Sequence, residues 1–156
     1  MATMFTKRRL LSPVTGSAVP LSAVPDEAFS QGLLGEGFAV EPRDGVVYAP
    51  IGGRIESVTD TLHAYSIHTD DGLDVLVHIG VDTVSLGGQG FSALVSPGDR
   101  VRAGDVIARA DLNAIRAAGL AVITPVIVAN PDELRGFALT LGEVQGGRTT
   151  VMTYKI

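Results

Sequence analysis

The chain has 156 residues, which is enough for one domain with a complete hydrophobic core. Apolar residues make up 46% of it and charged residues 19%, so the composition excludes an intrinsically disordered chain. Its 12 basic and 17 acidic residues give a formal net charge of −5, which makes nucleic acids and anionic membrane surfaces unfavourable partners. The absence of cysteine excludes disulfides, thiolate metal sites and a cysteine nucleophile.

The N-terminal residues give no targeting signal. The basic group at residues 7–9 is followed by only two leucines, whereas the apolar core of a secretory signal needs about 7–15 residues. No stretch of the sequence approaches the ~20 apolar residues of a membrane-spanning helix. We therefore expect a cytoplasmic protein without direct membrane insertion. Residues 1–10 are interpreted as a flexible N-terminal segment and residues 11–156 as a single domain.

Short apolar runs bounded by Gly, Pro or Asp follow one another along the chain, and their content of Val, Ile and Thr predicts strands. The predicted strands cover residues 45–50, 53–58, 64–67, 73–79, 106–108, 122–128 and 149–154. A helix is predicted over residues 112–118, between a capping Asp111 and a terminating Gly119, and a short turn over residues 25–32. Many short strands separated by turns are typical of an all-β sandwich or barrel.

Two segments, residues 46–58 and 96–107, are faintly similar to each other. Paired elements of this kind occur in carrier domains that hold a lipoyl or biotinyl lysine, and in one class of zinc peptidases. The carrier needs a lysine at a hairpin tip, and Lys7 and Lys155 near the two ends are the only lysines, which excludes this class. The peptidase typically has a His-x-His pair, but the residue two positions after His78 is a glycine, which disfavours the second class.

All three histidines, His63, His68 and His78, lie within sixteen residues and flank an Asp-Gly pair at 71–72, which is a strong hairpin signal. A two-residue loop at 70–71 or 71–72 would bring His63 and His78 to the same face, directly opposite or as diagonal neighbours about 7–8 Å apart. A three-residue loop would put them on opposite faces and remove the site. His68 is interpreted as a solvated residue near the hairpin tip.

The second strand of this hairpin indicates which of its faces is buried. Every second residue from 73 to 79 is apolar and predicted to face the core, so His78 faces outward or into a cleft. Thr61 shares the face of His63 and can hydrogen-bond one imidazole nitrogen, which would fix the tautomer. Two adjacent imidazoles suit a nucleophile with a hydrogen-bonding assistant, and equally two ligands of a zinc site.

Residues 71–91, DGLDVLVHIGVDTVSLGGQGF, resemble the active-site segment of the glucose-type enzyme IIA family. This family belongs to the bacterial phosphoenolpyruvate-dependent sugar phosphotransferase system. The resemblance extends over nearly the whole chain. The further segments that carry it are residues 11–16, 24–26, 46–64 (with His63 in a Thr-x-His-Ala sequence), 95–105 and 124–126.

The resemblance implies an all-β fold, an antiparallel β-sandwich or barrel with short helical turns, of the duplicated hybrid motif type. It also implies a phosphoryl relay without a required cofactor, in which His78 accepts the group from the phosphohistidine of the carrier HPr. The acceptor is the cysteine of an enzyme IIB domain of a glucose or N-acetylglucosamine permease. His63 corresponds to the histidine that hydrogen-bonds the phosphoryl group, and Thr61 to the residue that orients this histidine.

The resemblance also assigns residues to partner binding. Asp26 and Asp82 correspond to acidic positions where a basic residue of HPr docks. Four residues correspond to an apolar docking ring on the surface, namely Phe29, Leu33, Leu34 and Leu76. Without the resemblance, the first three of these would be interpreted as core. Two positions depart from the family pattern, with His68 in place of an acidic residue and Thr59 in place of an aromatic one.

An alternative interpretation is a regulatory binding module. Enzyme IIA proteins of this type also inhibit other proteins according to their phosphorylation state, and zinc shared between His63, His78 and a partner carboxylate is compatible with this role. Because the chain begins close to the domain and ends with it, we expect a free-standing component that is not fused to a permease.

Overall fold

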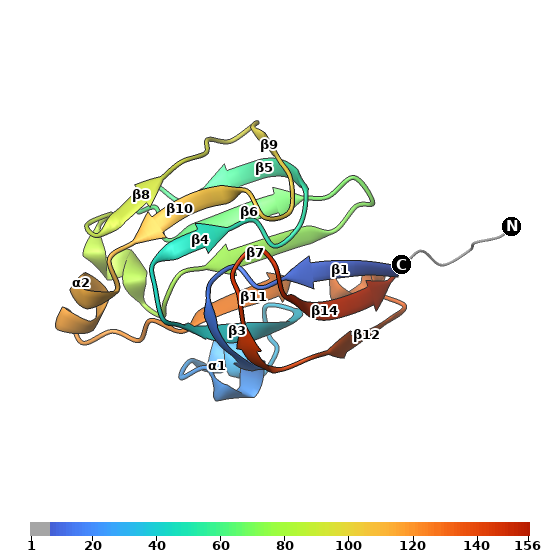
Figure 1. Ribbon diagram of the computed structural model, residues 1–156, viewed down its shortest axis with the longest axis horizontal. Helices are drawn as coiled ribbons and strands as arrows, with labels where there is room; N and C mark the ends of the chain where they lie inside the picture. The colour runs from blue at the N-terminus through green and yellow to red at the C-terminus, as the bar shows by residue number, and fades with distance from the viewer. Residues whose placement is uncertain (1–6) are drawn as a thin grey trace, which may run out of the picture.

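The computed structural model describes residues 7–156, which form three antiparallel sheets (Figure 1). The eight strands of the largest sheet are, in spatial order, β13 (Gly142–Val144), β2 (Gly16–Pro20), β3 (Glu36–Pro42), β11 (Thr124–Val128), β7 (Asp74–His78), β6 (Ala64–His68), β5 (Gly53–Val58) and β9 (Arg100–Val101). The first three-stranded sheet contains β1 (Lys7–Leu11), β14 (Thr150–Lys155) and β12 (Gly136–Leu139). The second contains β4 (Val46–Tyr48), β10 (Val106–Ala110) and β8 (Phe91–Ala93). The predicted all-β antiparallel fold is confirmed.

Helical structure is confined to short segments. These are η1 (Leu21–Ala23), α1 (Glu27–Ser30), η2 (Thr83–Leu86), α2 (Leu112–Ala117) and η3 (Pro131–Glu133). The predicted caps of α2 are present: Asp111 Oδ1 accepts a hydrogen bond from Ala114 N at 3.1 Å, and Gly119 takes a φ of +80° just after the helix. In the residues that the structure describes, no helix combines the length and apolar character needed to cross a bilayer.

The seven predicted strands are all present, with ends that shift by a few residues. Of the strands that were not predicted, β8, β9, β12 and β13 have four residues or fewer, and β2 and β3 contain glycine and proline, whereas β1 has five residues and neither. In β3, for example, Gly37 weakens the sequence signal for a strand, because glycine usually interrupts strands. In the structure a Cβ atom on Gly37 would lie 1.8 Å from the carbonyl oxygen of Val126, so this glycine permits the close approach of β3 to β11.

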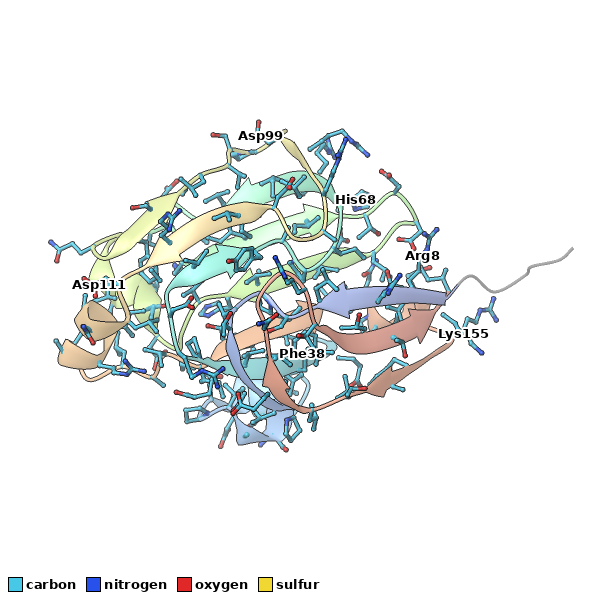
Figure 2. All side chains as sticks on the ribbon, viewed as in Figure 1. Arg8, Phe38, His68, Asp99, Asp111 and Lys155 are labelled. Atoms are coloured by element: carbon cyan, nitrogen blue, oxygen red, sulfur yellow. The ribbon has the colours of Figure 1, made fainter. Side chains whose placement is uncertain are left out.

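One large core lies between the sheets. It contains side chains from β1 and β14 in one small sheet, from β4 and β10 in the other, and from the inner faces of β3, β6 and β7, including Phe38 at the centre of Figure 2. The apolar alternation predicted for residues 73–79 is observed on β7, whose inward residues are fully buried. The outer face of β7 is left to Asp74, Leu76 and His78, which are half-buried.

A second, smaller cluster covers the outer face of the large sheet. Leu21 of η1 and Phe29 of α1 pack there against Ile127 of β11, with half-buried Leu76 at its margin. β11 is therefore covered on both faces, which agrees with the burial of all five of its residues. This cap of η1 and α1 ends beside His78 and forms one wall of the site described below.

The two mutually similar segments lie side by side in the structure. β4 from the first segment pairs with β10, and β5 pairs with β9 of the second segment. Each strand pair is antiparallel, and the two pairs belong to different sheets. Each of the two similar segments therefore contributes one strand to the large sheet and one strand to the same small sheet.

The predicted boundary of the N-terminal segment is wrong for residues 7–10. These residues belong to β1, which pairs with β14 from Lys7 opposite Lys155 to Leu10 opposite Met152. Leu10 is fully buried in the main core, so β1 is held by this apolar side chain as well as by its backbone pairing with β14. The rest of the predicted flexible segment, residues 1–6, lies outside the described residues.

The predicted register of the β6–β7 hairpin is also wrong. Thr69 and Leu73 close a three-residue loop, with Thr69 N donating to the carbonyl oxygen of Leu73 at 2.8 Å. Ala64 therefore lies opposite His78. This is the register that was expected to separate the two histidines.

Candidate functional site

Despite this register, the imidazole rings of His63 and His78 lie against each other. Their centroids are 4.8 Å apart and their planes are inclined by 77°. His63 precedes the first residue of β6, Ala64, so strand alternation does not control the direction of its side chain. Its carbonyl oxygen still accepts a hydrogen bond from Ile79 N at 2.7 Å, as the register requires. The inference that a three-residue loop removes the pair is therefore wrong.

Residues with left-handed backbone conformations flank both histidines. Leu62, directly before His63, has a φ of +62°, and Asp82, four residues after His78, has a φ of +61°. Within residues 7–156 these are the only non-glycine residues with positive φ. Such conformations cost about 1–3 kcal/mol each and persist where the surrounding structure holds them. Here they turn the chain at the ends of β6 and β7 and bring the two rings together.

A backbone contact determines the protonation of His78. Its Nδ1 lies 2.6 Å from the carbonyl oxygen of Gly80. Because a carbonyl oxygen can only accept, Nδ1 carries the proton and Nε2 keeps its lone pair in the neutral ring. The turn that places this carbonyl depends on Gly80 having a φ of +76° and on Thr83, whose hydroxyl donates to the carbonyl oxygen of Ile79 at 2.6 Å.

Two threonines hold the ring of His63. Thr61 Oγ1 lies 2.7 Å from Nδ1 of His63, and Thr59 Oγ1 lies 3.3 Å from the same nitrogen. Thr59 Oγ1 also accepts hydrogen bonds from the backbone N–H groups of His63 and Ala64, both at 3.1 Å. With Nδ1 engaged in this way, Nε2 is the nitrogen of His63 that remains for a ligand. The residue as a whole is only 6% exposed.

Burial lowers the pKa of both histidines below the ordinary value of 6.5. For His63 the second cause is the nearby charge of His78. For His78 the effect of burial exceeds three opposing influences, namely the hydrogen bond to Gly80 and the negative charges of Asp26 and Asp82. Both rings are therefore mainly neutral near pH 7, and His78 is then available as a nucleophile.

The structure brings the predicted acidic residues close enough to His78 to influence its charge. Asp26 caps α1, with Oδ1 accepting from Ala28 N at 2.8 Å, and Asp82 is exposed beside the turn that follows β7. The negative charge at this end of the molecule suits a basic partner surface.

The predicted apolar ring is only partly on the surface. Leu33 and Leu34, just after α1, are 70% and 43% exposed, and Leu76 is half-buried on the outer face of β7. Surface exposure was expected for Phe29, and this is wrong: it is 5% exposed and belongs to the second core cluster. Its ring lies 5.1 Å from that of His78 at 61°, so Phe29 forms a wall behind the imidazole.

Neither Gly80 nor Thr59 was predicted to be part of the site. Gly80 was considered only as the glycine that disfavours a His-x-His pair, and Thr59 only as a departure from the family pattern. The available signal for Thr59 was its spacing, since Thr59, Thr61 and His63 alternate. The histidine outside the pair, His68, lies at the other end of the hairpin, where Nδ1 is 2.7 Å from Oδ1 of Asp74.

The two histidines supply at most two ligands for a metal. A centroid separation of 4.8 Å is compatible with both Nε2 atoms reaching one zinc ion at about 2.0–2.1 Å. Across residues 7–156, no group of three or more His, Cys, Asp or Glu side chains is arranged to hold a metal. The remaining ligands would have to come from another molecule.

Comparisons with known proteins identify the family of the chain. The family described as phosphoenolpyruvate-dependent sugar phosphotransferase system, EIIA 1, matches residues 8–134. A glucose-specific EIIA component of the same system from Halalkalibacterium halodurans is 40% identical over 148 residues, covering 94% of this chain and 86% of the relative. The glucose-specific EIIA component of Staphylococcus aureus is 44% identical over 124 residues, covering 80% of this chain and 75% of the relative.

A longer relative and a solved structure are also similar. An N-acetylglucosamine-specific EIICBA component from Klebsiella pneumoniae is 40% identical over 151 residues, which are 96% of this chain but 23% of that protein. The solved glucose permease IIA from Mycoplasma capricolum superimposes with a TM-score of 0.89 at 34% identity, covering 98% of this chain and 99% of the other. The chain therefore belongs to the EIIA 1 family of the phosphoenolpyruvate-dependent sugar phosphotransferase system.

Proposed function

We propose that the chain carries a phosphoryl group on Nε2 of His78, accepting it from the phosphohistidine of HPr and passing it to the cysteine of an enzyme IIB domain. The observation that carries this proposal is the contact of His78 Nδ1 with the carbonyl oxygen of Gly80, which leaves Nε2 as the free nucleophilic nitrogen. Membership of a sugar phosphotransferase family supports the same direction of transfer.

In the first step, the lone pair of His78 Nε2 attacks phosphorus while the N–P bond of phospho-HPr breaks. The bonding electrons return to the imidazole of HPr. The ring of His78 gains positive charge as its own N–P bond forms, and the Gly80 carbonyl together with Asp26 and Asp82 stabilises that charge. Phosphoryl transfer depends mainly on such positioning and charge stabilisation.

His63 steadies the transferred group. We assign the hydroxyl of Thr61, 2.7 Å away, as the donor to Nδ1 of His63, so that Nε2 carries the proton and donates a hydrogen bond to a phosphoryl oxygen. In the second step, the thiolate of the IIB cysteine attacks phosphorus, the N–P bond breaks, and its electron pair returns to Nε2 of His78. The thiol must come from the partner, since this chain has no cysteine.

Phosphorylation by phosphoenolpyruvate, enzyme I and HPr, followed by mass spectrometry, tests this assignment. His78→Ala should remain unphosphorylated. His63→Ala should accept the group but fail to pass it on, because the phosphoryl group is no longer held in line for the thiolate. His68→Ala is the matched control and should behave as the unchanged protein. Phosphate on the His78→Ala protein contradicts the assignment.

The acceptor we propose is a IIB domain of a glucose or N-acetylglucosamine permease. Curated relatives with both specificities match the chain at the same 40% identity, so the identity does not favour either sugar. A coupled assay that offers both IIB domains and follows which sugar is phosphorylated decides between them. Phosphorylation of neither sugar contradicts this acceptor class.

A second role is supported by the exposed Leu33 and Leu34, which follow α1 and its contact with His78. An apolar surface next to a phosphorylatable histidine can bind a regulated protein, and phosphorylation adds about two negative charges there and weakens docking. His63 and His78 would hold a zinc ion only together with a carboxylate of the partner, and such a shared set of ligands would strengthen the complex. Co-purification with the phosphorylated and unphosphorylated chain, with and without a chelator, tests this role, and equal capture in all four conditions contradicts it.

A further inference from the structure

A groove of about 840 Å³ lies at the tip of the β6–β7 hairpin, at the end away from the histidine pair. It is lined by the start of β1, residues 51–53, the hairpin tip at 69–71, and residues 100–105. Arg8 and His68 mark this end of the molecule in Figure 2, whereas Asp111 lies at the opposite end. β7 runs from Asp74, next to the hairpin tip, to His78, and its four steps of about 3.4 Å place His78 about 14 Å from that end of the strand.

The groove is rich in arginine. Four arginines, Arg8, Arg9, Arg100 and Arg102, line it together with three aspartates. This local excess of positive charge occurs in a chain whose formal net charge is −5. It contrasts with the histidine site, where the neighbouring charged side chains, Asp26 and Asp82, are negative.

Two of these arginines are already paired. Arg100 binds Asp70 at 2.6 Å, and Arg8 binds Asp71 at 3.2 Å. The third aspartate, Asp105, accepts from the backbone N–H of Arg102 at 2.8 Å and closes its own turn. Within residues 7–156, the guanidinium groups of Arg9 and Arg102 have no ion-pair partner. Two cationic groups are thus available to a ligand.

The walls of the groove are held in place before any ligand binds. Asp71 accepts from the hydroxyl of Thr69, and the same hydroxyl oxygen accepts from Leu73 N at 2.9 Å. A Cβ atom on Gly53, the first residue of β5, would lie 2.5 Å from the carbonyl oxygen of His68, so the start of β5 packs directly on the hairpin. A backbone that is already fixed reduces the ordering cost of binding.

We propose that this groove binds the phosphate monoester of a small phosphorylated molecule through Arg9 and Arg102. A guanidinium presents a planar fork that matches phosphate oxygens, and the double negative charge of a monoester matches two unpaired arginines. The volume falls within the range of about 300–1,000 Å³ typical of small-molecule sites. The site is separate from His78, so the inference does not depend on the proposed phosphoryl transfer.

Titration of the full chain with glucose 6-phosphate at low ionic strength, followed by calorimetry and amide chemical shifts, tests the proposal. Saturable binding should shift the amides of residues 8–9, 69–71 and 100–105, with glucose itself producing no shift. Arg9→Gln combined with Arg102→Gln should weaken binding by about tenfold or more, the loss expected for charged hydrogen bonds. Arg109→Gln combined with Arg116→Gln removes the same charge near Asp111, at the opposite end of the molecule, and should leave binding unchanged. His78→Ala should also bind normally.

Vesicles distinguish a free phosphate monoester from a lipid headgroup. Binding to phosphatidic acid vesicles that is lost in the Arg9→Gln/Arg102→Gln variant, without binding of glucose 6-phosphate, identifies a lipid as the source of the same monoester chemistry. Equal binding to phosphatidic acid and phosphatidylglycerol vesicles indicates general charge attraction and overturns the proposal. Absence of saturable binding to every probe, or equal loss of affinity in the two double variants, also overturns it.

Discussion

Gly80 packs so closely against Thr83 that a Cβ atom on the glycine would lie 2.6 Å from Cγ2 of the threonine. The same atom would lie 2.8 Å from the carbonyl oxygen of Ala121. With a φ of +76°, Gly80 holds a turn that other residues adopt at a cost, and its carbonyl oxygen accepts the hydrogen bond that Nδ1 of His78 donates. The protonation of the nucleophile therefore depends on a tightly packed glycine.

Gly80→Ala should destabilise the protein by roughly 2–4 kcal/mol, because a steric clash adds to the strain of positive φ. It should also slow phosphorylation of His78, since the carbonyl oxygen is displaced. Gly87→Ala is the matched control: Gly87 has a φ of +61°, but a Cβ atom on it would meet no other atom within 4 Å. Urea unfolding and phosphorylation rates should separate the two variants, and equal effects would show that the packing around Gly80 is unimportant.

Thr61→Val should leave the fold nearly unchanged but slow transfer from His78 to the IIB domain, because the hydroxyl that fixes Nδ1 of His63 is lost. Thr59→Val should instead lower the free energy of unfolding by about 1–3 kcal/mol per unsatisfied backbone donor, since its Oγ1 accepts from two backbone N–H groups. Chemical denaturation and single-turnover transfer measure the two effects. Identical behaviour of the variants would contradict the division of roles between the threonines.

The lowered pKa values of His63 and His78 predict that stability decreases in mild acid. Below the unfolded-state pKa of 6.5 the unfolded chain binds protons that the folded histidines do not, so stability is complete above pH 6.5 and is lost as pH falls toward the folded-state pKa values. Urea unfolding between about pH 5 and 8 measures this slope. The slope should be smaller in His78→Gln, and an unchanged slope in that variant would refute the link.

Asp82→Asn should lower the pKa of His78 further, because the negative charge of Asp82 raises it. The substitution suits the backbone, since asparagine tolerates the left-handed conformation that Asp82 adopts at a φ of +61°. Asp132→Asn, on the exposed η3, is the control and should leave the titration unchanged. A ¹⁵N-detected histidine titration measures the pKa of His78 in both variants. An increase in this pKa in Asp82→Asn would argue against the charge effect.

Leu33→Asp should raise the KM for HPr with little change in kcat or stability, because Leu33 is 70% exposed next to α1 and contributes no core contact. Leu94→Asp provides the comparison, since Leu94 is 51% exposed but follows β8 in a different sheet. Steady-state phosphorylation at varied HPr concentration distinguishes them. Equal KM values for the two variants would exclude Leu33 from the docking surface.

The sequence predicted most of the central strands because their signals are local. Residues 53–58, 64–67 and 73–79 combine β-branched side chains with turn residues at both ends, and these patterns require no knowledge of the fold. The alternation in 73–79 also identified the buried face of β7 and the outward direction of His78. Strands such as β1 and β3 were missed since their stability comes from pairing and burial across long sequence distances.

The prediction that the two histidines form a pair is correct, but the structural reason given for it is wrong. The expected route was a two-residue loop that aligned both rings on one face of the hairpin. The observed loop has three residues, and His63 reaches His78 because it precedes β6 and follows Leu62 in a left-handed conformation. A one-residue change in register reverses the faces only within a strand, so residues at strand ends escape that rule.

The amino-acid sequence alone determined the fold class and the outward direction of His78, because strand alternation is a local property, and the family motif identified His63 and Thr61 as its companions. Only the tertiary structure decided the hairpin register, the burial of Phe29 behind His78, and the roles of Thr59 and Gly80. Those features arise where segments distant in sequence meet, as when α1 covers β7 and β11. Packing between such segments depends on shapes and backbone angles that composition and periodicity do not encode.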